Sequence, residues 1–211
     1  MRPALLFIVL AAAGLSGAAT PAQPPPEFVT AIESLPRLAA AEIERGILPG
    51  FSIALVDDQR VVWSGGFGLA DVKKKLPAQP DTLYRVGSIS KLFNAVAVMQ
   101  QVEAGKLDLD APVQKFAPDF RIQSRFTNAG PVTLRQLLCH RSGLIRESPV
   151  GGYFDDQQPT VFATVRSVAD CALVNPPNTQ TRYSNIGATV AGYAAQSVAG
   201  MAFDFYQREH I

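Results

Sequence analysis

One uninterrupted apolar segment limits the folds open to this chain. Residues 91–103 contain no glycine or proline, and apolar side chains recur there every three or four residues. This spacing predicts a long helix. Its apolar stripe consists of Leu92, Val96, Met99 and Val102. Further apolar residues widen the stripe, so we expect the helix to be buried on most sides and to end near Gly105.

The segments before this helix predict an antiparallel hairpin and another helix. Residues 51–56 and 60–67 are rich in β-forming side chains and flank the turn sequence 57–59, which predicts a hairpin. Residues 28–46 have apolar positions at helical spacing but contain Pro36, so one kinked helix or two short helices are expected.

Shorter helices are expected in the second half of the chain. Thr133 is a suitable N-cap for a helix that reaches about His140. Further helices are expected over residues 161–172 and 186–198, followed by an amphipathic segment over 203–211. The helix over 186–198 is rich in alanine and glycine, so a neighbouring helix can pack closely against it.

The first residues have the pattern of a secretory signal. Arg2 precedes an uncharged stretch with an apolar part over residues 4–15, and Gly17 and Ala19 are small residues suited to a signal peptidase. We therefore expect export, to the periplasm or outside the cell. An uncleaved anchor is the alternative, but about twelve strongly apolar residues are fewer than the ~20 that a spanning helix needs. No stable membrane span is expected after cleavage.

Three segments follow from this pattern. We expect a signal peptide over residues 1–19, a proline-rich linker over 20–26 and a single domain over 27–211. Hydrophobic residues make up 47% and charged residues 18% of the chain, which is typical of a globular domain.

Charge and cysteine content exclude several other functions. With 19 basic and 18 acidic residues the net charge is +1, so no nucleic-acid partner is expected. Cys139 and Cys171 could form one disulfide after export, or they could remain two separate buried thiols. The two histidines, His140 and His210, do not form a metal-type cluster with them, so neither a metal nor another cofactor is expected.

The run from Ser88 to Lys91 has the pattern S-x-x-K where a loop passes into the long helix. Residues three apart lie on one face of a helix, so the Lys91 amine can reach the Ser88 hydroxyl. A lysine that loses its proton on partial burial can activate such a serine as a nucleophile. Unpaired N–H groups at the helix start favour the oxyanion that forms on a carbonyl. The alternative is a capping serine beside an ordinary surface lysine.

A second motif, Tyr183-Ser184-Asn185, has the pattern Y-x-N and also precedes a helix. Alternate residues of an extended segment point the same way, so Tyr183 and Asn185 can face one cleft while Ser184 turns away. The tyrosine could relay the serine proton, and the asparagine amide could hold a substrate carbonyl. The alternative is a half-buried core tyrosine beside a helix-capping asparagine.

With both motifs the chain resembles the serine β-lactamase-related hydrolases. This family includes class C β-lactamases, D-alanyl-D-alanine carboxypeptidases and related esterases. The resemblance extends from about residue 28 to the last residue. Besides the two motifs it rests on five runs, over residues 48–54, 65–68, 84–87, 105–110 and 137–144.

The resemblance implies a β-lactamase/transpeptidase-like fold of the α+β class, with an antiparallel sheet flanked by helices, a helical region and a cleft between them. It implies that Ser88 is acylated, that Lys91 and Tyr183 together act as the base and that Asn185 contacts the substrate. His140 is expected to be a hydrogen-bonded core residue and not a catalytic one. The substrate is expected to be a small molecule or a peptide with a reactive carbonyl.

Relatives carry a third motif on a downstream strand, in which Lys or His precedes Gly, and this strand supplies the second oxyanion-hole N–H. Residues 1–211 do not contain it, so we expect the chain to be truncated before most of the sheet. The expected function is hydrolysis or acyl transfer at an amide, ester or β-lactam carbonyl, as in a β-lactamase, a carboxypeptidase or an esterase. The alternative is a catalytically silent relative that binds cell-wall peptide or a partner without turnover.

Overall fold

The computed structural model describes residues 26–153, 155–157 and 159–211. The described residues group into two compact units, the first ending at Arg85 and the second running from Val86 to Ile211. The expected signal peptide and all of the expected linker except Pro26 lie outside the described residues, so export stays a prediction. No described helix is long and apolar enough to cross a membrane. All four residues proposed for catalysis and substrate binding belong to the second unit.

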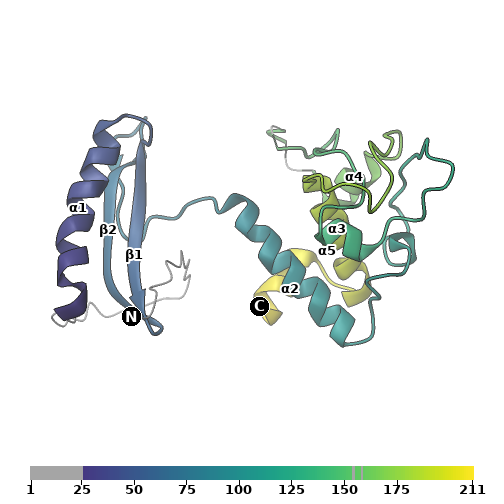
Figure 1. Cartoon of the computed structure of the whole chain (residues 1–211), viewed down its shortest axis with the longest axis horizontal. Coiled ribbons are helices and arrows are strands. Elements are labelled where there is room, and N and C mark those ends of the chain that lie inside the picture. The colour runs from purple at the N-terminus through teal and green to yellow at the C-terminus, as the bar shows by residue number, and fades with distance from the viewer. Residues whose placement is uncertain (1–25, 154, 158) are drawn as a thin grey trace. The chain divides into compact units, whose positions relative to one another are not determined.

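In the first unit a helix lies along a small antiparallel sheet (Figure 1). Its elements are η1 (Pro26–Phe28), α1 (Val29–Glu44), β1 (Gly50–Asp57), β2 (Arg60–Asp71) and β3 (Leu76–Pro77). β1 and β2 form the predicted hairpin, with Phe51 opposite Phe67. Asp58 and Gln59 make the turn with φ of 41° and 68°, and positive φ at both positions matches the twist of a two-residue hairpin.

Two features of this unit refine the prediction. The helix continues through Pro36, so the chain forms one helix and not two; Pro36 lies on its exposed side. The hairpin also gains a neighbour that the sequence did not indicate, because the short strand β3 pairs with β2 at Leu69 and Asp71.

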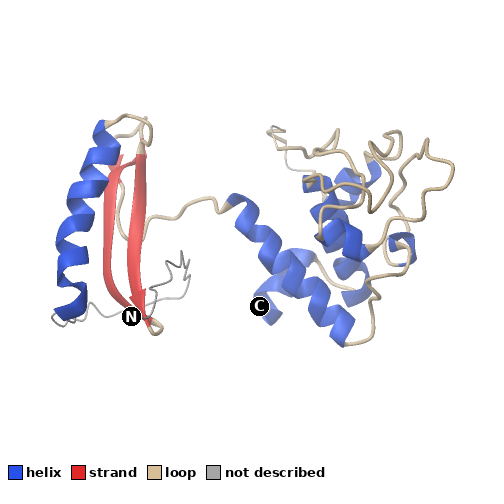
Figure 2. Cartoon of the chain, viewed as in Figure 1, coloured by secondary structure: helices blue, strands red, loops and turns tan. Residues whose placement is uncertain are grey.

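The second unit is built from helices and long loops (Figure 2). Its elements are η2 (Gly87–Ile89), α2 (Ser90–Glu103), η3 (Val113–Lys115), α3 (Leu134–Leu138), α4 (Val161–Arg166), α5 (Asn185–Ala199) and α6 (Phe203–His210). Helix α5 is central, because α2, α3, α4 and α6 all contact it. Ser184 caps its N-terminus, and Gly200 ends it in the left-handed conformation.

The core of the second unit surrounds α5. Four α5 side chains are almost fully buried: Ile186, Val190, Ala191 and Ala194. They pack with buried apolar residues from α2, from α3 and from the loops, namely Val98, Phe120, Leu134, Leu137 and Leu144. This apolar cluster holds the start of α5, and hence the Y-x-N motif, in place.

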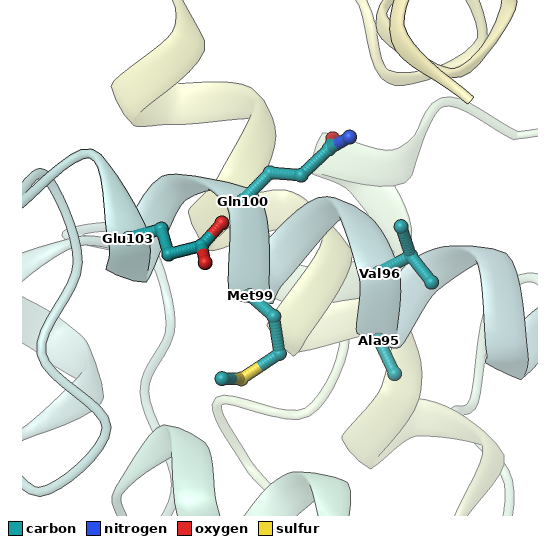
Figure 3. A pocket seen from close by; sticks show the side chains of 5 residues that line it. All are labelled: Ala95, Val96, Met99, Gln100 and Glu103. Carbon is teal, nitrogen blue, oxygen red and sulfur yellow. The ribbon is translucent and has the colours of Figure 1, made fainter.

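The orientation of α2 differs from the prediction. Of the predicted stripe, Leu92 is 64%, Val96 37% and Met99 44% exposed. The buried side chains of α2 are Asn94, Ala97, Val98 and Gln101. Figure 3 shows the outward face, where a surface pocket is lined by Ala95, Val96, Met99, Gln100 and Glu103.

The physical reason for this orientation is the contact with α5. The Asn94 side chain donates to the carbonyl oxygen of Ala188 at 2.6 Å, and small alanines on both helices allow a close approach. A specific hydrogen bond and small residues therefore select a mixed face of α2, with Ala97 and Val98 beside Asn94 and Gln101, over its more apolar stripe.

Shorter elements also depart from their predicted lengths. α3 begins at the predicted cap, where Thr133 and Gln136 form a reciprocal capping box, but it ends at Leu138 because His140 adopts a left-handed φ of 56°. α4 ends at Arg166, six residues before the predicted end, and the chain continues in tight turns. Cys139 is exposed and Cys171 only partly buried, and both are free, so the two cysteines form neither the disulfide nor the pair of buried thiols that the sequence left open.

Candidate active site

Ser88 lies where a loop turns into the first long helix of the second unit. It occupies the middle of η2, which continues directly into α2, so Ser88 and Lys91 share one helical face as predicted. The Lys91 amine donates to the Ser88 hydroxyl at 3.2 Å. Ser88 is exposed and Lys91 is half-buried, so a reactive hydroxyl faces solvent beside a sheltered amine.

The Y-x-N motif has the predicted alternating geometry. Ser184 is extended, with φ −135° and ψ 118°, and is 1% exposed. Its hydroxyl accepts from the N–H of Gly187 at 2.9 Å and donates to the carbonyl of Ile145 at 2.7 Å. Because Ser184 points inward, Tyr183 and Asn185 lie on the opposite side, toward Ser88 and Lys91.

Close packing of α2 on α5 brings the two motifs together. A Cβ atom on Gly192 would lie 2.8 Å from Oδ1 of Asn94, so the helices can approach this closely only with glycine at that position. Asn94 lies one turn after Lys91 on α2. The tight contact therefore places the start of α2 beside the start of α5.

All four predicted site residues meet in one hydrogen-bonded array. The Tyr183 hydroxyl donates to Ser88 Oγ at 2.6 Å. Lys91 Nζ donates to Asn185 Oδ1 at 2.7 Å and lies 4.8 Å from the centre of the Tyr183 ring. The serine oxygen thus receives hydrogen bonds from both candidate bases, and Asn185 orients the lysine.

Neighbouring charges alter the acidity of the tyrosine. The Lys91 ammonium, and next the Ser88 hydroxyl, hold the pKa of Tyr183 below its ordinary value near 10 because both stabilise the phenolate. Burial opposes this shift, but Tyr183 is 37% exposed and the opposing effect is smaller. The arrangement therefore makes proton loss from Tyr183 easier than from a free tyrosine.

His140 lies against Tyr183 and is hydrogen-bonded to the backbone of Ser184. Its Nδ1 accepts from the N–H of Ser184 at 3.2 Å, and its ring lies 4.4 Å from the Tyr183 ring. Burial, and then the charge of Lys91, lower the pKa of His140. A neutral imidazole can accept through Nδ1, so His140 is hydrogen-bonded as predicted, but it is only partly buried and does not belong to the core.

Two functional candidates escaped the sequence reasoning. Glu147 accepts a hydrogen bond of 2.6 Å from the Asn185 amide, and the Arg146 guanidinium lies 5.2 Å from the centre of the Tyr183 ring. No spacing rule links position 147 to position 185. One hydrogen of the Asn185 amide is engaged by Glu147, so only the other remains for the substrate carbonyl assigned to it by the motif.

No cluster of three or more His, Cys, Asp or Glu side chains able to hold a metal occurs among the described residues. The array is instead composed of hydroxyl, amine, amide and carboxylate groups that exchange hydrogen bonds. These groups suit nucleophilic attack by an activated serine.

Comparison with known proteins identifies the family of the chain. Residues 35–211 match the family model described as Beta-lactamase. The mitochondrial serine beta-lactamase-like protein LACTB of Homo sapiens is 40% identical over 126 residues, which cover 59% of this chain and 23% of LACTB.

Solved structures share the fold. EstCE1, titled a hydrolase with promiscuous acyltransferase activity, has a TM-score of 0.72 at 26% identity over 86% of this chain and 51% of its own. The D-amino acid amidase from Ochrobactrum anthropi SV3 has a TM-score of 0.69 at 27% identity, over 83% of this chain and 47% of its own.

The chain thus spans about a quarter of LACTB and about half of each of these two structures. The β-lactamase/transpeptidase-like fold expected from the sequence is confirmed. Because the family match covers residues 35–211, the chain belongs to the beta-lactamase family.

Proposed function

We propose that the protein is a serine hydrolase or acyltransferase that works through an acyl-Ser88 intermediate. The observation that carries this proposal is the pair of hydrogen bonds on Ser88 Oγ, from Tyr183 at 2.6 Å and from Lys91 at 3.2 Å. Either group can accept the serine proton once it has lost its own, and a base within reach of the serine hydroxyl is what nucleophilic catalysis requires.

The acylation step follows from these contacts. Ser88 Oγ attacks the substrate carbonyl carbon, a C–O bond forms, and the hydroxyl proton passes to whichever of Lys91 and Tyr183 is unprotonated. The lowered pKa of Tyr183 favours its phenolate in this role. N–H groups at the start of the helix stabilise the oxyanion, and the carbonyl then re-forms as the bond to the amine or alcohol breaks. The leaving group takes the proton.

Release of the acyl group reverses these roles. Water, or an acceptor alcohol or amine, attacks the acyl-serine carbonyl and gives up a proton to the same base pair. The ester bond to Ser88 breaks and the serine regains its proton, so the enzyme is restored. We assign amide, ester and β-lactam carbonyls as the substrate class, supported by the hydrolase and amidase titles of the two structural neighbours.

The proposal is tested by covalent labelling. The purified chain is treated with a fluorophosphonate and, separately, with a fluorescent penicillin, and intact mass and peptide mapping locate the adduct. We expect one adduct, on Ser88, and none in Ser88→Ala. Ser90→Ala is the matched control, because Ser90 lies two residues away and its hydroxyl makes no hydrogen bond with the described residues of the array. An adduct that persists in Ser88→Ala overturns the site, and absence of any adduct overturns the hydrolase proposal for this chain.

A further inference from the structure

Glu147 holds the side of Asn185 that faces away from Lys91. Its Oε1 accepts from Asn185 Nδ2 at 2.6 Å, while Asn185 Oδ1 accepts from Lys91 Nζ at 2.7 Å. The Glu147 side chain is only 30% exposed, so solvent competes weakly for this bond. Asn185 therefore bridges a carboxylate and an ammonium.

The chemistry of the two partners allows only one orientation of the amide. A carboxylate only accepts and an ammonium only donates, so the amide nitrogen must face Glu147 and the amide oxygen must face Lys91. If the Asn185 amide were flipped, both hydrogen bonds would be lost. The amide oxygen would then face the Glu147 carboxylate, and the amide nitrogen would face the Lys91 ammonium. The two partners therefore fix the orientation of the Asn185 amide.

Glu147 itself is fixed by its loop. The Arg146 carbonyl accepts from the N–H of Asn185 at 2.8 Å and from the N–H of Ile186 at 3.4 Å, which ties the loop to the start of α5. The other carboxylate oxygen, Oε2, accepts from the N–H of Tyr153 at 3.1 Å. Both oxygens of Glu147 are therefore in use, and its position relative to Asn185 is built into the fold.

The surrounding charges give this carboxylate a second effect. Lys91, Tyr183, His140 and Arg146 all lie in or beside the array, and Arg146 Nε is 3.4 Å from Glu147 Oε1. Glu147 is the acidic side chain of this group. It balances positive charge while it directs the amide oxygen toward Lys91.

We propose that Glu147 is a positioning residue for the acylation of Ser88. Its carboxylate locks the Asn185 amide so that the amide oxygen holds the Lys91 amine within reach of the serine. This inference rests on the proposed function, because it assumes that Lys91 and Ser88 act together. Loss of the lock lets Lys91 move, and small displacements of a catalytic group lower rates by as much as about 100-fold.

The first experiment measures the rate at which a fluorophosphonate labels Ser88. Glu147→Ala is expected to slow labelling about 10- to 100-fold, whereas Glu147→Gln slows it less because a carboxamide oxygen still accepts. Glu103→Ala is the control, since Glu103 lies at the far end of α2 on the surface shown in Figure 3. Equal rates for Glu147→Ala and Glu103→Ala overturn the proposal.

An exchange of the two groups separates positioning from general stability. Asn185→Asp alone places two carboxylates 2.6 Å apart and is expected to slow labelling strongly. Adding Glu147→Gln restores a hydrogen bond in nearly the same volume, in which the new glutamine amide donates to the new aspartate at position 185. The aspartate carboxylate also still accepts from Lys91. We expect the double variant to label at least tenfold faster than Asn185→Asp. A double variant no faster than Asn185→Asp contradicts the lock.

A measurement that needs no activity keeps the two proposals apart. The side-chain amide of Asn185 is followed by proton–nitrogen NMR and assigned with Asn185→Asp. We expect its signals to move in Glu147→Ala and to stay in place in Glu103→Ala. If the wild-type chain is not labelled but these signals respond, the hydrolase proposal fails and the contact stands. If the Asn185 amide signals do not move in Glu147→Ala, the positioning role of Glu147 is refuted, whatever the labelling result.

Discussion

Gly143 is the position where one added methyl group should do the most damage near the site. Its φ is +75°, and a Cβ atom there would lie 2.1 Å from the backbone oxygen of Asn175. Ordinary contact begins near 3.4 Å, so one of the two backbone segments must move by roughly 1 Å. Gly143 also lies between His140 and the loop that carries Glu147, so the movement reaches the array.

The magnitude follows from two separate costs. A left-handed backbone costs a residue with a Cβ about 1–2 kcal/mol, and overpacking against backbone costs about 1–3 kcal/mol more. Gly105→Ala isolates the first cost, because Gly105 has φ +69° and nothing within 4 Å of its Cβ position. We expect Gly143→Ala to lower the free energy of unfolding by ~2–5 kcal/mol and Gly105→Ala by ~1–2 kcal/mol.

Thermal unfolding followed by circular dichroism measures the difference. At about 4 °C per kcal/mol for a unit of this size, Gly143→Ala should lower Tm by ~8–20 °C and Gly105→Ala by ~4–8 °C. Ser88 labelling should slow in Gly143→Ala and remain unchanged in Gly105→Ala. Equal losses of Tm in the two variants would refute the argument from the Asn175 contact.

Two further predictions concern a pKa and a helix cap. The pKa of the His140 imidazole should lie below its ordinary value of about 6.5. Lys91→Met should raise this pKa, because the charge of Lys91 is one of the two causes of the shift. NMR titration in a His210→Gln background, where His140 is the one remaining histidine, measures both values. The pKa of His140 is lower in the folded state than in the unfolded state. Its contribution to stability is therefore complete above pH ~6.5 and declines as the pH falls toward the folded-state pKa. A free energy of unfolding that rises as the pH falls through this range would contradict the assignment. Thr133→Ala breaks the capping box with Gln136 and should lower the free energy of unfolding by about 1 kcal/mol in a urea titration, whereas no change would mean that water replaces the cap.

The sequence alone determined the features that depend on neighbours along the chain. The approach of Lys91 to Ser88 follows from the three-residue spacing on a helix, and the outward placement of Tyr183 and Asn185 follows from one extended residue between them. The hairpin and the cap at Thr133 are equally local, since turn and cap chemistry depend on a few adjacent residues.

The tertiary structure decided which distant groups meet and which helix face is buried. Glu147 and Asn185 are 38 positions apart, and no periodicity relates them; their contact exists because the loop after Gly143 is hydrogen-bonded to the start of α5. Helix α2 buries Asn94 and not Leu92, because the glycine and alanines of α5 offer a close fit and a carbonyl acceptor to that face. Hydrophobic periodicity identifies a helix, but the shape and hydrogen-bonding groups of its partner choose the face, and only the folded chain supplies that partner.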